Sequence, residues 1–374
     1  MPNLIALAIP LFFIAIGVEL VVARRRRRPV YRLGSAMADM GCGVAQQLVG
    51  VLVGAFSLGI YAWVYSHRVL TLPDKSLWSW LAAIIGVEFF YYWWHRGSHE
   101  VNLLWAAHVV HHHSEDYNLA VALRQSVTTW ATMLPFYLPL AILGVPTFEY
   151  AVVLSPSTLY QFWIHTELVP PLGFLERWLN TPSLHRVHHA INPRYLDKNH
   201  SATFIVFDRL FGTYQREEHE EACTYGITRP LGSYNILWAQ VAGYVDLVRM
   251  ARRAPNWRQA LKVFVASPAW HPEWLERQPP GPPPSIGKYE PSPTARAKWH
   301  ALGQFALLII GVFSFLMWGG QLSGLATAVC FALFTMTLIT VPALIESKQW
   351  AWKAEGARLL LMVPAIALLV TGAL

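Results

Sequence analysis

Long apolar stretches recur along the chain, and polar residues collect between them. A helix needs roughly 20 apolar residues to cross the hydrocarbon core of a bilayer. We interpret eight stretches as candidate spans, of which the fourth should be bent and shallow because it contains Pro135 and Pro139. They cover residues 3–23, 36–65, 77–94, 125–148 and 148–164, two segments within 301–345, and 359–374. The pattern therefore predicts an all-α integral membrane protein built on a transmembrane helical bundle.

Most of the polar residues lie in one long segment, residues 166–300. Within it, residues 279–284 read Pro-Pro-Gly-Pro-Pro-Pro, which is typical of an extended linker. We predict four parts: an N-terminal anchor with a basic run (1–29), a core (30–275), a Pro-rich linker (276–298) and C-terminal transmembrane helices (299–374).

Composition and charge agree with a membrane protein. Hydrophobic residues make up 54% of the 374 residues and charged residues 14%, whereas soluble proteins average roughly 25% charged residues. The formal net charge is +7, and six arginines, at 24–28 and 32, lie beside the first span rather than along a recognition helix. This placement argues against nucleic-acid binding. By the positive-inside rule the run faces the cytoplasm, and counting crossings places residues 166–300 there as a helical cap.

Eight of the 15 histidines form three clusters with helical spacing. Positions i, i+3 and i+4 share one face of a helix, so each cluster presents its imidazoles together. Neutral imidazole is a strong ligand for Fe, Zn, Cu and Ni, and eight such ligands suit two ions. His165, at the end of the predicted hairpin, is a ninth candidate. The clustered residues are His95, His99, His108, His111, His112, His185, His188 and His189.

The remaining histidines read as ordinary surface or core residues. His113 lies off the shared face of its cluster, and His200 has no local partner, so we interpret both as non-ligands. A zinc-protease motif is excluded because Leu103 stands where its second histidine would fall. The isolated histidines are His67, His219, His271 and His300.

The clusters resemble the three histidine boxes of the fatty-acid hydroxylase and sterol desaturase superfamily. The matching segments are HRGSH (95–99), HVVHH (108–112), HRVHH (185–189) and the later DRLFGTY (208–214). Residues 80–235 are most similar to the ether-lipid-cleaving alkylglycerol monooxygenase branch. That similarity is carried by residues 95–118, ALRQS (122–126), QFWIHTE (161–167), NTPSLHRVHH (180–189) and DKNHSATFIVFDRLFGTY (197–214).

The resemblance implies a non-haem di-iron centre that uses O₂ on a lipid C–H bond. By position the eight clustered histidines match the family's iron ligands, and His165 matches an additional histidine of some members. Glu100 matches an acidic residue after the first box. The branch is expected to use tetrahydrobiopterin, while other members take electrons from a donor protein.

Acidic residues near the boxes are candidates for orienting the imidazoles, because a ligating imidazole needs a partner for its second nitrogen. Glu100, Asp116, Glu167 and Asp197 are placed for this role. The alternative is a solvated loop acid or a helix cap, and it is the stronger reading for Glu167 and Asp197.

Glu88 lies inside the third predicted span, and positions 88, 92, 95 and 99 share a helical face. An intramembrane carboxylate is costly and often functional, so Glu88 and Tyr92 could lie beneath the metals or in a substrate pocket. A structural hydrogen bond to a neighbouring helix is an equal alternative.

Other residues near the boxes could shape the entry of a lipid or bind a charged group. The predicted walls are Trp93, Trp94, Trp105 and Trp163. Arg124 and Arg186 could meet a phosphate or a pterin, although salt bridges to Glu115 or Asp116 are the simpler reading.

The leading hypothesis is a membrane-bound di-iron monooxygenase acting on a lipid. A sterol or fatty-acyl hydroxylase or desaturase is the nearest alternative, and a zinc hydrolase is a weaker one. A metal transporter is disfavoured, because transport predicts ligands near the bilayer midplane and these histidines lie at helix ends. The sequence identifies neither the lipid, the metal, the electron donor, the oligomeric state nor the role of the C-terminal helices.

Overall fold

The computed structural model describes residues 4–275 and 287–370, and every regular element within these ranges is a helix. The predicted all-α fold is thus confirmed. Four helices are long and apolar enough to cross a membrane, which makes the chain an integral membrane protein. These are α1 (Leu4–Arg25), α2 (Leu33–Ser66), α11 (Ala295–Trp318) and α12 (Gly324–Ile345).

The other predicted spans do not meet this criterion over the described residues. Helices α5 (Thr129–Ile142) and α6 (Thr147–Trp163) have 14 and 17 residues, and at 1.5 Å per residue they are shorter than a hydrocarbon core of about 30 Å. Helix α3 (Leu77–Glu100) is long enough, but its last turns carry histidines and charges. Helix α13 (Ala351–Val370) carries charges in its first turns.

Parts of three predicted segments lie outside the described residues. These parts are residue 3 of the first span, 276–286 of the linker and 371–374 of the last span. Helix α11 begins at Ala295, inside the predicted linker.

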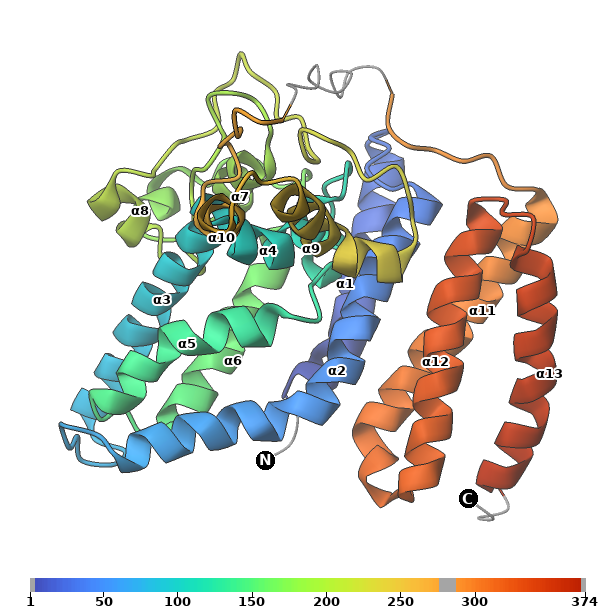
Figure 1. Cartoon of the computed structure of the whole chain (residues 1–374), viewed down its shortest axis with the longest axis horizontal. Helices are drawn as coiled ribbons and strands as arrows, with labels where there is room; N and C mark the ends of the chain where they lie inside the picture. The colour runs from blue at the N-terminus through green and yellow to red at the C-terminus, as the bar shows by residue number, and fades with distance from the viewer. Residues whose placement is uncertain (1–3, 276–286, 371–374) are drawn as a thin grey trace.

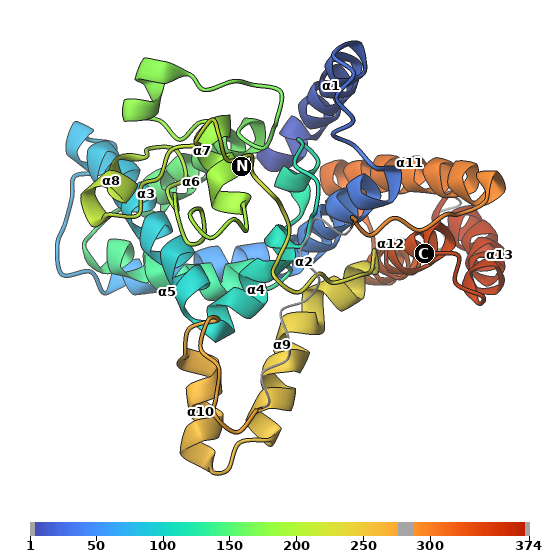
Figure 2. The same ribbon diagram turned by 90° about the horizontal axis from the view of Figure 1, so that it is seen from above.

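Short helices cover one end of the bundle and form a cap (Figure 1). Seen from above, α9 and α10 project from the body as a hairpin, and α11, α12 and α13 stand to one side (Figure 2). The short elements are α4 (Asn102–His112), η1 (Val121–Leu123), η2 (Gly173–Arg177), α7 (Pro182–His189), α8 (Val206–Phe211), α9 (Ile236–Arg252) and α10 (Trp257–Val265). Helix α11 continues into the short turn η4 (Gly319–Gln321).

Local sequence explains several helix boundaries. The hydroxyl groups of Ser76, Thr294 and Ser323 each accept a hydrogen bond from the backbone N–H three residues later, at the starts of α3, α11 and α12. Gly144 turns the chain between α5 and α6 with a φ of +85°, and a Cβ there would lie 2.3 Å from the backbone oxygen of Leu70. Only glycine fits this turn without displacing the backbone.

A hydrophobic cluster joins the C-terminal helices to the rest of the molecule. Met37 and Leu48 of α2 pack with Phe305 and Val312 of α11 and Leu338 of α12, and all five are buried. The C-terminal part is therefore packed against the rest of the chain as well as linked to it.

A buried ionic network also holds the C-terminal helices together. Arg358 and Glu355 of α13 are 2% and 1% exposed, and their side chains are joined at 2.7 Å. Glu355 also accepts hydrogen bonds from His300 of α11 and Thr340 of α12.

Replacing Arg358 with methionine is expected to lower the free energy of unfolding by about 3–5 kcal/mol, because the buried Glu355 carboxylate loses its arginine partner and keeps only His300 and Thr340. Thermal unfolding of the detergent-solubilised chain measures this. The double variant Arg358→Met with Glu355→Gln should recover most of the loss. Equal losses in the single and double variants would contradict the assignment of the effect to the carboxylate that lacks its arginine partner.

Candidate metal centre

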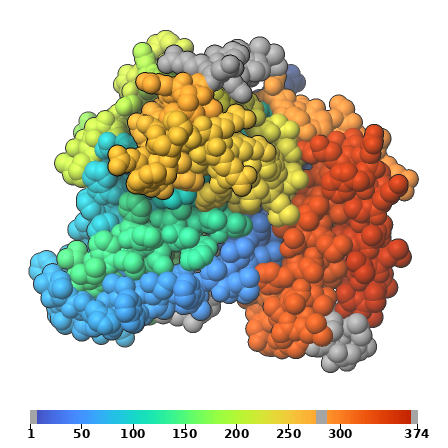
Figure 3. Space-filling view, in the orientation of Figure 1, coloured from blue at the N-terminus to red at the C-terminus, as the bar shows by residue number. Residues whose placement is uncertain are grey.

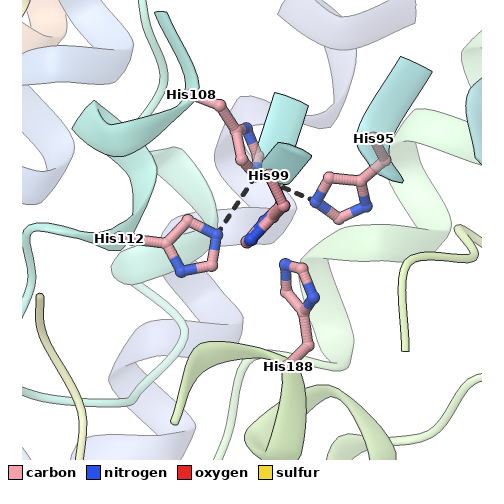
Figure 4. A group of neighbouring side chains, drawn as sticks. All are labelled: His95, His99, His108, His112 and His188. Atoms are coloured by element: carbon pink, nitrogen blue, oxygen red, sulfur yellow. Dashed lines mark hydrogen bonds between the residues drawn. The ribbon is translucent and has the colours of Figure 1, made fainter. Parts of the chain in front are cut away.

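Nine buried histidines converge in the cap from four segments of the chain. The first group comprises His95, His99, His108, His112 and His188, and the second group comprises His111, His165, His185 and His189. Within each group the candidate ligand nitrogens lie within 4.8 Å of one another. Figure 4 shows the five imidazoles of the first group pointing toward a common space.

Helix geometry decides which group each imidazole joins. On α4, His108 and His112 are four residues apart and share the first group, while His111 turns to the second. On α7, His185 and His189 share the second group, while His188 turns to the first. The sequence analysis expected each cluster to meet at one point, but α4 and α7 each contribute to both groups. The reason is that the residues at i+3 and i+4 are consecutive and point about 100° apart around a helix.

The fold places these helices by interrupting α3. Val101 ends α3 and begins α4 in an extended conformation, with φ −126° and ψ 120°. The chain then turns back, so His95 and His99 at the end of α3 face His108 and His112 on α4. His165 lies just beyond the end of α6.

Backbone carbonyls fix the orientation of four imidazoles. The Nδ1 atoms of His95, His111, His165 and His188 lie 2.6 Å, 2.8 Å, 2.7 Å and 2.9 Å from the carbonyl oxygens of His200, Arg124, Gln161 and Lys198, respectively. A carbonyl oxygen only accepts, so each Nδ1–H donates and each Nε2 carries a lone pair. This is the tautomer that binds a metal through Nε2.

Several of the Nε2 lone pairs face another acceptor or have no hydrogen-bond donor. Nε2 of His111 and Nε2 of His165 lie 3.2 Å apart, and both are acceptors because both Nδ1 atoms donate. The buried Nε2 atoms of His99, His188 and His189 have no hydrogen-bond partner. Two nitrogens bound to one ion at about 2.1 Å would lie roughly 3.0–3.4 Å apart for angles of 90–110°. The donor sets therefore fit two metal ions, one in each group.

Burial favours the neutral form, which a ligand requires, in several of these imidazoles. It lowers the pKa of His111 to about 4. It also lowers the pKa values of His185, His188 and His189 well below the usual value. At neutral pH these side chains are uncharged and available as ligands.

The acidic candidates are mostly occupied elsewhere. Glu100 is 53% exposed and pairs with Arg96 at 2.8 Å. Asp116 is buried and pairs with Arg32 and Lys288. Both carboxylates are bound by cations, and neither belongs to a histidine group within the described residues.

Asp197, for which the solvated reading was the stronger one, lies 3.3 Å from Nδ1 of His99. Glu167, like His113 and His200, belongs to neither histidine group within the described residues.

Glu88 takes part in a structural hydrogen-bond network. It is 3% exposed, and it accepts hydrogen bonds from the Ser157 hydroxyl at 2.7 Å and from the backbone N–H groups of Thr203 and Phe204. It thereby ties α3 to α6 and to the segment before α8. The geometry matches the structural alternative. Tyr92 likewise bonds Thr213 rather than an imidazole.

Arg124 and Arg186 form buried ion pairs, but not with the predicted partners. Arg124 pairs with Asp39 at 3.0 Å and Arg186 with Glu217 at 2.6 Å. Glu115 and Asp116 are bound instead by Arg32.

A cavity of about 530 Å³ reaches the histidines from the helical bundle. His95, His108, His111, His165 and His185 line one end. The rest of its wall comes mainly from α1, α2, α5, α6 and α11. In the space-filling view a hollow separates α2 from the C-terminal helices over the lower half of the molecule (Figure 3).

The cavity wall differs from the predicted one. Trp94 lines it, but Trp93, Trp105 and Trp163 do not, and Trp130 does. The sequence analysis also did not predict that α2 and α11 form part of the cavity wall. A signal was available in α2, where Gln46, Gln47, Gly50 and Gly54 interrupt an apolar span and all line the cavity.

Comparison with known proteins gives one family and several relatives. A family model described as fatty acid hydroxylase matches residues 80–213, which contain all nine histidines. Among curated relatives, the alkylglycerol monooxygenase of Homo sapiens is 40% identical over 273 residues, covering 72% of this chain and 61% of the relative. The one from Danio rerio is 35% identical over 370 residues, covering 97% and 82%. The one from Caenorhabditis elegans is 30% identical over 351 residues, covering 88% and 69%.

The chain spans about three fifths of the length of the human and Xenopus tropicalis relatives that it matches. No solved structure matches it.

Proposed function

Because the chain belongs to the fatty acid hydroxylase family, in the group that contains the alkylglycerol monooxygenases, we propose that it is a membrane-bound dimetal monooxygenase that hydroxylates a lipid C–H bond with O₂. The observation that carries this proposal is the cavity, because five histidines of the two groups line one end of a largely apolar space open to the bundle. A lipid chain in that space would present a carbon to the metals.

Iron is the metal we assign to both groups. Dioxygen activation requires a redox-active ion, which excludes Zn²⁺ as the reactive metal. The nine histidines would hold the two ions, and the bound iron would supply the activation of O₂ and the oxidation of the C–H bond.

The residues of the chain bind and orient the substrate. The apolar wall removes the lipid chain from water, and the buried site excludes water from the reacting carbon. Gln46, Gln47 and Gln125 place amide groups along the cavity, where they can bond the polar end of a lipid. The basic run Arg24 to Arg28 supports a cytoplasmic position for the cap.

An alkylglycerol ether is the substrate class that we assign. Hydroxylation of the carbon next to the ether oxygen consumes O₂, two electrons and two protons, and releases one water molecule. The resulting hemiacetal breaks its C–O bond to give an aldehyde and glycerol. Tetrahydrobiopterin is the assigned electron source, with a donor protein as the alternative.

The test is metal analysis of the purified full chain combined with product analysis in air with tetrahydrobiopterin, on a long-chain 1-O-alkylglycerol and, in parallel, on a fatty-acyl lipid and a sterol. We expect about two iron ions per chain and release of a fatty aldehyde. A hydroxylated acyl or sterol product, with no aldehyde, would assign the chain to another substrate class of the same family. Stoichiometric zinc after iron-replete anaerobic preparation, with no oxygenated product, would overturn the proposal.

A further inference from the structure

One short segment, residues 197–201, carries the outer partners of three imidazoles in the first group. Asp197 lies 3.3 Å from Nδ1 of His99. The carbonyl oxygen of Lys198 accepts from His188 at 2.9 Å, and that of His200 accepts from His95 at 2.6 Å. We call residues 197–201 the orienting loop. His95 and His99 lie on α3 and His188 lies on α7, so this loop sets the relative orientation of imidazoles from two helices.

The orienting loop contains two residues with left-handed backbone. Asp197 and Asn199 have φ values of 56° and 57°, a region that Asp and Asn adopt more readily than other residues with a side chain. Even for these residues the conformation costs free energy, so contacts with the surrounding chain help to hold it.

Two buried side chains provide these contacts. The Asp208 carboxylate on α8 accepts hydrogen bonds from the backbone N–H groups of His200 and Ser201, at 2.7 Å and 2.9 Å. The Asn199 side chain donates to the carbonyl oxygens of Leu184 and Gln215, at 2.8 Å and 2.6 Å. Asp208 and Asn199 are both 0% exposed. Their polar atoms therefore hold the loop rather than meet solvent.

The second group has a separate support. His111 donates to the carbonyl oxygen of Arg124. The Arg124 side chain is in turn fixed by Asp39 at 3.0 Å and by the carbonyl oxygen of Val110 at 2.6 Å. No residue of the orienting loop takes part in this arrangement. The outer partner of His111 thus lies outside the orienting loop, which holds the outer partners of His95, His99 and His188.

We propose that Asp208 and Asn199 are positioning residues for the first group, acting through the orienting loop. By holding that loop they keep the two carbonyl oxygens and the Asp197 carboxylate aimed at Nδ1 of three imidazoles, which leaves Nε2 of each facing the ion. Asp39 and Arg124 do the same for His111 of the second group. This inference rests on the proposed function in one respect, namely that each group binds a metal ion.

The experiment measures binding of Co²⁺ to the metal-free full chain in detergent, by bound metal per chain and by the visible absorption spectrum of the bound ion. The wild type should bind two ions. Asp208→Asn should lower the affinity for one ion by 10- to 100-fold, the range typical for loss of an outer partner of a metal ligand. It should also change the absorption spectrum of that ion. Asp39→Asn should weaken the other ion by a similar factor.

Double variants identify the weakened ion. Asp208→Asn combined with His189→Ala should lose tight binding of both ions, whereas Asp208→Asn combined with His188→Ala should keep one. Asp246→Asn is the matched control, because it makes the same substitution at an exposed residue of α9, which pairs with Arg249. It should bind two ions with the wild-type spectrum.

If Asp208→Asn binds two ions with wild-type affinity and an unchanged spectrum, the inference is overturned. An equal loss of affinity for both ions in a folded variant would also overturn it. A wild type that binds no metal would overturn the proposed function and the inference together. If Asp208→Asn does not fold, Asn199→Gly decides by the same criteria, because glycine removes the side-chain bonds to Leu184 and Gln215 and accepts the positive φ.

Discussion

Replacement of His188 with alanine is expected to reduce lipid oxidation by more than about 100-fold, because loss of even an outer partner of a metal ligand costs 10- to 100-fold. The Nε2 atom of His188 is buried without a hydrogen-bond partner and faces the first group. Removing it leaves that group with four nitrogens around its ion. The measurement is aldehyde release from a long-chain alkylglycerol, together with iron per chain.

His219→Ala is the matched control, because His219 is exposed and belongs to neither group. It should keep wild-type activity and iron content. Equal tolerance of both substitutions would contradict the assignment of the grouped histidines as ligands.

Replacement of Gly54 with leucine is expected to lower kcat/KM for long alkyl chains by roughly 5- to 150-fold. The factor corresponds to a cost of about 1–3 kcal/mol for forcing extra carbon atoms into a filled space. Gly54 lines the cavity, and a Cβ placed there meets no atom within 4 Å. The leucine side chain would therefore occupy space that the lipid uses. Competition between short and long alkylglycerols measures the effect, and the short chain should be little affected.

Gly59→Leu provides the comparison on the same helix. Gly59 also has open space around its Cβ position, but it does not line the cavity. Both substitutions should favour the helix, since leucine exceeds glycine in helix propensity by close to 1 kcal/mol. A similar loss for long chains in both variants, or none in Gly54→Leu, would rule out the cavity as the site of the lipid chain.

The histidines could be found from sequence because their geometry is local. Residues four apart on a helix share a face wherever the helix lies, so the spacing of His95 and His99, or of His185 and His189, already implied a pair. The assignment of His111 and His188 to opposite groups was out of reach, because it depends on how α4 and α7 pack against α3.

The partners of the imidazoles could not be predicted for a different reason. Four are backbone carbonyl oxygens, at His200, Lys198, Arg124 and Gln161. Every residue has such an oxygen, so no side-chain pattern identifies the ones that are used. Because carboxylates are recognisable in a sequence, Glu100 and Asp116 were predicted as partners, but both pair with arginines.

Four of the eight predicted spans do not meet the length and composition criterion within the described residues, and apolar composition alone does not distinguish a lipid-facing helix from one buried in protein. The α5–α6 hairpin is apolar since it packs on α2 and α3, where Tyr137, Leu140 and Tyr150 are buried. Once the boundaries at Thr129 and Trp163 are known, the lengths of 14 and 17 residues show that neither helix is long enough to cross the hydrocarbon core.

Helix α11 supplies Ile309, Val312, Phe313 and Leu316 to the cavity wall, although it lies far in sequence from every histidine of the centre. None of these four residues orients an imidazole. Substitutions there can alter which lipids are accepted while the oxidising machinery stays intact. Substrate preference and metal binding can therefore be changed separately, through α11 on the one hand and through the histidine-bearing helices on the other.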